Sequence, residues 1–93
     1  MAKKNRPVSI NATAKATVYG TSNRWSLSPF DSSDEGRMVD VRLAIQGNAK
    51  HGFHLVQSPD GFFTADSHSP TLDDALTLAQ ELYGIPASAW TET

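Results

Sequence analysis

Apolar and polar residues alternate along the first part of the chain, which is the pattern of strands with one buried face. Between residues 8 and 19, one side of the expected strand carries Val8, Ile10, Ala12, Ala14, Ala16 and Val18. Gly20 ends the alternation, so residues 8–19 are predicted to form a strand. Because three of these six side chains are alanines, the strand buries little apolar area, and we expect an edge position or partial disorder.

Shorter segments continue the pattern with the same period. The expected strands are residues 24–28, 38–46, 53–58 and 62–67. The turn before the last strand has the sequence Ser58-Pro59-Asp60-Gly61, in which proline fixes φ at the second position and glycine accepts a positive φ at the last. We therefore predict a three-stranded antiparallel meander over residues 38–67.

Residues 71–83 change to helical spacing. Thr71 is a predicted N-cap, and Asp73 and Asp74 in the first turn complement the positive end of the helix dipole. Gly84 and Pro86 are expected to end the helix. The apolar stripe consists of Leu72, Ala75, Leu76, Ala79, Leu82 and Tyr83. Residues 87–90 are expected to form one further turn that brings Trp90 onto the core.

The order of elements predicts an α+β fold with one antiparallel sheet of four to five strands and a single C-terminal helix packed on one face. Ninety-three residues form one domain, here residues 8–93, preceded by a basic flexible tail at residues 1–7. The expected core is Val41, Leu43, Phe53, Leu55, Phe63, Leu72, Leu76, Ala79, Leu82 and Trp90.

Composition narrows the possible functions. The chain has no cysteine, which excludes disulfides, thiolate catalysis and cysteine-bound metals. A small extracellular domain without disulfides would be unusual, so we expect a cytoplasmic protein. No apolar run reaches the roughly 20 residues that cross a bilayer, so no membrane association is expected.

The charges are segregated along the sequence. All eight Lys and Arg residues lie at or before Lys50, whereas residues 51–93 carry only acidic side chains among their charged residues. The net charge of −2 therefore conceals a basic first half and an acidic second half. Such an arrangement bears on which partners the protein attracts.

Conventional catalytic and metal-binding groups are few. His51 and His54 are three residues apart, and positions i and i+3 of a strand face opposite ways, so they are not expected to chelate one ion. His68 is placed in the loop before the helix. We expect no enzyme activity, no metal and no cofactor.

The outer face of the helix is the predicted binding surface. Asp74, Thr77 and Glu81 point away from the apolar stripe and Asp73 flanks them. The expected partner-binding residues are Asp73, Asp74 and Glu81, with Asp66 at the edge. A surface of one sign attracts a partner of the other sign. We expect a non-catalytic protein-binding module that occludes a basic, nucleic-acid-binding surface of its target.

The rival interpretation is direct nucleic-acid binding by the basic first half. Its phosphate and base contacts would come from Lys3, Lys4, Arg6, Arg24 and Trp25. The acidic helix cannot enter a major groove, which argues against this alternative.

Two segments resemble part of a known family. The sequence Asp-Gly-Phe-Phe-Thr-Ala at residues 60–65, followed by Thr-Leu-Asp-Asp-Ala-Leu at residues 71–76, is similar to the strand and "TLEEAL" helix of HicB-type antitoxins. The family's Pro-Gly-Cys loop and its DNA-binding segment have no counterpart here. By size and charge, the chain is also similar to small cysteine-free phage inhibitors such as anti-CRISPR proteins. Both resemblances imply an inhibitor that binds a protein.

Overall fold

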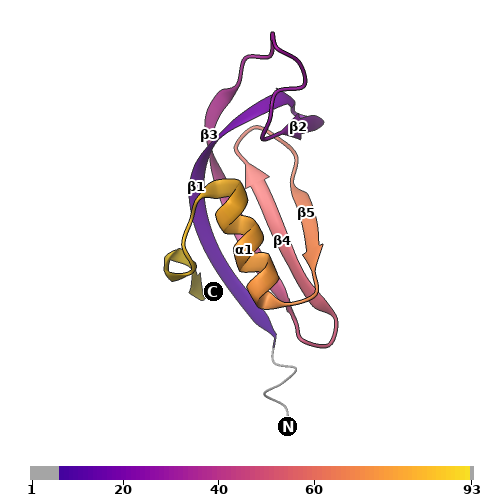
Figure 1. Ribbon diagram of the computed structural model, residues 1–93, viewed down its shortest axis with the longest axis vertical. Coiled ribbons are helices and arrows are strands. Elements are labelled where there is room, and N and C mark those ends of the chain that lie inside the picture. Colours follow the sequence, from indigo (N-terminus) through magenta and orange to yellow (C-terminus); the bar gives the residue numbers. More distant parts are fainter. Residues whose placement is uncertain (1–6, 93) are drawn as a thin grey trace.

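The computed structural model describes residues 7–92, which form one antiparallel sheet with a single α-helix against it (Figure 1). Its elements are β1 (Val8–Thr21), β2 (Arg24–Ser26), β3 (Arg37–Asn48), β4 (Gly52–Pro59), β5 (Ala65–Ser69), α1 (Leu72–Tyr83), a 3₁₀ turn η2 (Ala87–Ala89) and β6 (Thr91–Glu92). The sheet is curled as a half-barrel, and α1 packs against it. The predicted α+β fold is therefore confirmed.

Strand order in the sheet is β2-β1-β3-β4-β5, with β6 pairing the start of β1. The longest ladder joins β1 to β3, from Val8 opposite Gly47 to Val18 opposite Arg37. On its other side, among residues 7–92, β1 pairs only near its two ends, with β6 and with β2. The alanine-rich segment thus forms a full strand, with a sheet neighbour along one side and short partners on the other.

Small and branched side chains form the core between the sheet and α1. Its buried members are Ala14, Val41, Leu43, Ile45, Phe53, Leu55, Ala75 and Ala79. Leu72, Leu76 and Trp90 are partly buried and pack against this cluster, as predicted. Phe63 and Leu82 were wrong as core residues, because they are 46% and 40% exposed.

Both ends of α1 have the predicted chemistry. The Thr71 hydroxyl accepts a hydrogen bond from the backbone N–H of Asp74 at 3.1 Å. Gly84 adopts φ 70°, and its N–H donates to the carbonyl of Gln80. Glycine suits this position because a side chain is strained in the left-handed region. η2 follows, which confirms the expected turn before Trp90.

The turn between β4 and β5 lies one residue later than predicted. The N–H of Phe62 donates to the carbonyl of Pro59 at 3.1 Å, and Gly61 takes the positive φ of 86°. The following strand was predicted at residues 62–67, but β5 is Ala65–Ser69. His68 therefore belongs to a strand and not to the loop before the helix.

Residues 62–64 instead join the two sides of the curled sheet. The N–H of Phe63 donates to the carbonyl of Ser22 at 2.9 Å, and the indole N–H of Trp25 donates to the carbonyl of Phe63 at 2.9 Å. The rings of Trp25 and Phe63 also meet edge to face, with centroids 6.2 Å apart. This closure draws Phe63 away from the core beneath α1.

Candidate functional site

The outer face of α1 carries exposed carboxylates. Asp73, Asp74 and Glu81 are all exposed, and within residues 7–92 no Lys or Arg forms an ion pair with them. Asp74 and Glu81 are seven residues apart, which places them on the same side of the helix, about 10 Å apart along its axis. These three residues are called the acidic helix face below.

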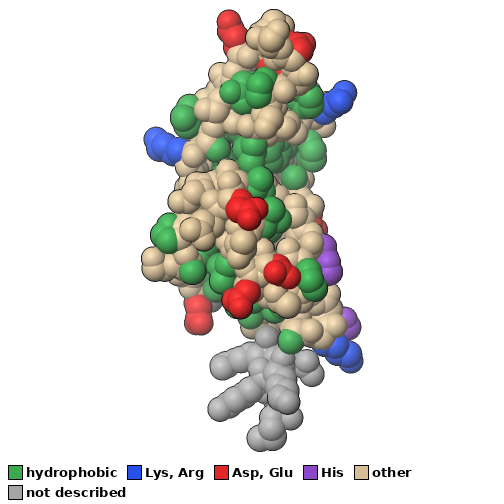
Figure 2. All heavy atoms as spheres, in the orientation of Figure 1, with side chains coloured by type: hydrophobic (Ala, Val, Ile, Leu, Met, Phe, Trp, Pro, Cys, Tyr) green, Lys and Arg blue, Asp and Glu red, His purple; other side chains and the backbone are tan. Residues whose placement is uncertain are grey.

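The last turn of α1 also carries an exposed leucine. Leu82 follows Glu81 and is 40% exposed. Figure 2, which views the molecule from the helix side, shows red carboxylates over the middle of the molecule and blue basic groups only near its margins. The acidic helix face therefore carries negative charge with no basic side chain on α1, whereas Leu82 lies about 100° around the helix from Glu81, on the side of Ala75.

Asp66 lies on a different surface. Successive side chains of β4 alternate between the two sides of the sheet, with Phe53 and Leu55 buried beneath α1 and His54 exposed on the opposite side. His54 Nδ1 lies 3.1 Å from both carboxylate oxygens of Asp66. The structure therefore brings Asp73, Asp74 and Glu81 together but places Asp66 on the far face of the sheet.

Of the alternative, nucleic-acid-binding surface, the structure describes Arg24 and Trp25. The guanidinium of Arg24 lies over the ring of Phe30, 5.0 Å from its centroid. Trp25 is half-buried, and its indole N–H donates to the backbone carbonyl of Phe63. The Trp25 side chain therefore helps to hold residues 62–64 against the other side of the sheet. Lys3, Lys4 and Arg6 lie outside the described residues.

Two other basic residues have acidic neighbours on the open face of the sheet. Lys15 pairs with Asp40 and Arg42 with Asp60, each at 3.9 Å. All four side chains are more than half exposed, so these pairs contribute little stability. They do, however, lower the positive potential of this face.

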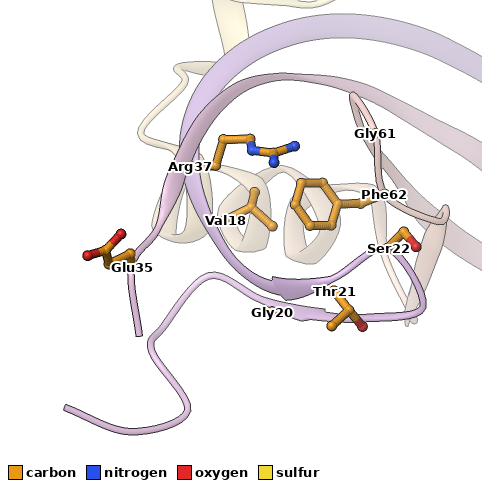
Figure 3. Close-up of a pocket in the computed structure, with 8 residues that line it drawn as sticks. All are labelled: Val18, Gly20, Thr21, Ser22, Glu35, Arg37, Gly61 and Phe62. Carbon is orange, nitrogen blue, oxygen red and sulfur yellow. The ribbon is translucent and has the colours of Figure 1, made fainter. Parts of the chain in front are cut away.

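A hollow lies next to the hydrogen bond that joins the N–H of Phe63 to the carbonyl of Ser22 (Figure 3). Its volume is about 300 Å³, at the lower end for small-molecule sites. Val18, Gly20, Thr21 and Gly61 contribute to its wall, and the guanidinium of Arg37 lies 6.0 Å from the centroid of the Phe62 ring. Glu35 points away from the hollow (Figure 3). Sequence analysis missed this feature because it depends on a contact between residues 41 positions apart.

The open face of the sheet also carries a pair of histidines. His54 and His68 are directly opposite each other in β4 and β5, and their ring centroids are 5.0 Å apart. No group of three or more metal-ligating side chains occurs within the described part of the chain. Sequence analysis compared His54 with His51, and so missed the pairing with His68.

Comparison with protein-family models, with curated proteins and with solved structures gives no match. Among the described residues, no helix is long and apolar enough to span a membrane. The surface of the protein is therefore the basis for its proposed function.

Proposed function

We propose that this protein is a small non-catalytic protein-binding module of the cytoplasm. Its target carries a basic surface that normally holds nucleic acid, and the protein occludes that surface. It acts as a bacterial or phage inhibitor, similar in kind to anti-CRISPR proteins or antitoxins. The observation that carries this proposal is the acidic helix face, on which three exposed carboxylates have no basic partner on the described surface.

Electrostatics explains how such a face selects a partner. Carboxylates of one sign raise the rate of encounter with a basic surface, and they oppose binding to acidic ones. Asp74 and Glu81 lie two helical turns apart, so they contact two separate cations of the target, as two phosphates of a nucleic acid would. Because α1 is capped at both ends, the spacing of these carboxylates along its backbone is set before binding.

Leu82 offers the interface an apolar contact in addition to the charged ones. Exposed ion pairs contribute only about 0.2–1 kcal/mol each, whereas apolar side chains at the centre of an interface contribute more. Leu82 is 40% exposed in the last turn of α1, and it gives the interface an apolar contact at its margin. We therefore place the interface along α1 from Asp73 to Glu81, with Leu82 at its margin.

Affinity capture from a bacterial lysate tests the proposal. The helix variant Asp73→Asn/Asp74→Asn/Glu81→Gln removes three negative charges from α1. The control variant Glu35→Gln/Asp60→Asn/Glu92→Gln removes three from exposed positions elsewhere. Wild type and control are expected to retain the same protein, and the helix variant is expected to lose it. Circular dichroism of all three confirms that each is folded.

The rival function gives a different result in the same experiment. A nucleic-acid-binding protein would retain nucleic acid at about 0.1 M salt, would lose it steeply as salt rises, and would fail when Lys3, Lys4 and Arg6 become Gln. That result, or equal capture by the helix variant and wild type, would overturn the proposed function. Replacing His51, His54 and His68 together by Gln is expected to leave capture unchanged.

A further inference from the structure

His54 and His68 are held side by side by the backbone. They form a directly opposed pair in the β4–β5 ladder, in which Leu55 pairs with Ser67 at the next position. Opposed residues of an antiparallel pair have their Cβ atoms about 4.5–5.5 Å apart on the same face. The two imidazole rings accordingly lie 5.0 Å apart at an angle of 66°.

Each ring has one nitrogen facing a hydrogen-bond acceptor. Nδ1 of His54 lies 3.1 Å from both oxygens of the Asp66 carboxylate, and Nε2 of His68 lies 3.1 Å from the backbone carbonyl of His51. A carbonyl and a carboxylate can only accept, so these nitrogens carry the protons. Nε2 of His54 and Nδ1 of His68 are then left with lone pairs.

This is how proteins hold metal-ligating histidines. The second ring nitrogen donates to a carboxylate or a backbone carbonyl, which fixes the tautomer and makes the ligating nitrogen more basic. Both acceptors are present here, one for each ring. Asp66 also places a negative charge beside the pair, and its side chain and that of His54 are about half exposed, so an ion can reach them.

We propose that His54 and His68 form a binding site for a divalent transition-metal ion, with Nε2 of His54 and Nδ1 of His68 as ligands. Imidazole nitrogen suits Cu²⁺, Ni²⁺ and Zn²⁺, whereas Mg²⁺ and Ca²⁺ prefer oxygen. Since the described residues offer no group of three ligands, water completes the coordination. The ion is therefore exchangeable, unlike the zinc of a closed structural site with four protein ligands.

This inference departs from the absence of metal expected from the sequence. That expectation compared His51 with His54 and placed His68 in a loop. The shift of β5 to Ala65–Ser69 puts His68 opposite His54 instead. The site lies on the face of the sheet opposite α1, so it is independent of the proposed protein-binding function.

Titration calorimetry of the metal-free full chain with Cu²⁺, Ni²⁺ and Zn²⁺ tests the site. One ion is expected to bind per chain, with Cu²⁺ the tightest of the three. His54→Gln and His68→Gln are each expected to abolish this binding. His51→Gln is the matched control, since it contributes only its backbone carbonyl and should bind like wild type.

Two further measurements separate ligand roles from structural ones. Asp66→Asn is expected to weaken binding about 10–100-fold without abolishing it, because Asp66 orients a ligand. Nitrogen-15 spectra of the histidine rings with Zn²⁺ should show Nε2 of His54 and Nδ1 of His68 shifted on binding. Absence of binding to all three ions, or equal loss in His51→Gln, would overturn the site.

Discussion

Gln57 is a polar side chain buried beneath α1, and its amide is paired on both sides. The hydroxyl of Tyr83 donates to Gln57 Oε1, and Gln57 Nε2 donates to the hydroxyl of Ser67 at 3.2 Å. Gln57 is only 5% exposed, so each lost partner leaves a polar atom in a dry environment. This small network ties the last turn of α1 to two strands.

Removing the Tyr83 hydroxyl should therefore destabilise the fold. Tyr83→Phe leaves the carbonyl oxygen of Gln57 without its donor, and we expect a loss of about 1–3 kcal/mol in the free energy of unfolding. Urea denaturation measures the change. A loss below about 0.5 kcal/mol would show that Gln57 does not depend on this bond.

The same hydroxyl predicts a pH dependence at the alkaline end. Burial raises the pKa of Tyr83 from 10.0 to about 12. The folded state therefore favours the protonated phenol, and this contribution to stability is fully present below pH 10 and is lost as pH rises from 10 to 12. The stability difference between wild type and Tyr83→Phe should narrow over that range. A constant difference would contradict this account.

At the scale of elements, α1 packs through its small residues. Ala75 and Ala79 are fully buried at the contact with the sheet, whereas Leu82, on the predicted stripe, is 40% exposed. The bond from Tyr83 to Gln57 directs Tyr83, rather than Leu82, toward the sheet in the last turn. Helical periodicity predicted the stripe correctly over its first two turns, but it could not show where a long-range bond would orient the last.

This packing predicts that substitutions at two positions of α1 destabilise the protein to different extents. Ala75→Leu adds volume to a closed contact and should cost about 1–3 kcal/mol of stability. Leu82→Ala removes volume from a largely exposed position and should cost less than about 1 kcal/mol. Thermal and urea unfolding of both variants measure these changes. A larger loss from Leu82→Ala than from Ala75→Leu would show that Leu82 belongs to the core, as the sequence had predicted.

Local signals predicted elements well where they were unambiguous. The alternation from Val39 to Ile45 and the caps Thr71 and Gly84 identify β3 and α1 almost to the residue. The sequence Ser-Pro-Asp-Gly at residues 58–61 is compatible with two positions of the turn, and the structure uses the later one. Residues 62–64 also leave the ladder to contact Ser22 and Trp25, so β5 begins only at Ala65 and His68 becomes the partner of His54. Local patterns do not show this long-range contact.

At the scale of the whole molecule, the segregated charges of the sequence become distinct surfaces. Exposure of Asp73, Asp74 and Glu81 follows from helical periodicity alone, and the structure shows all three exposed. The separation of Asp66 from them depends on which face of β5 it occupies, and the hollow near Arg37 depends on the closure by Phe63. Both of these depend on long-range pairing, which a single sequence does not show.

Competition with nucleic acid tests the central proposal most directly. The target retained by wild type is purified, bound to its nucleic acid, and titrated with wild type, the helix variant and the control variant. Three lost charge contacts at about 0.5 kcal/mol each predict about tenfold weaker displacement by the helix variant, and unchanged displacement by the control. Equal displacement by the helix variant and wild type, or simultaneous binding of protein and nucleic acid to the target, would contradict the proposal.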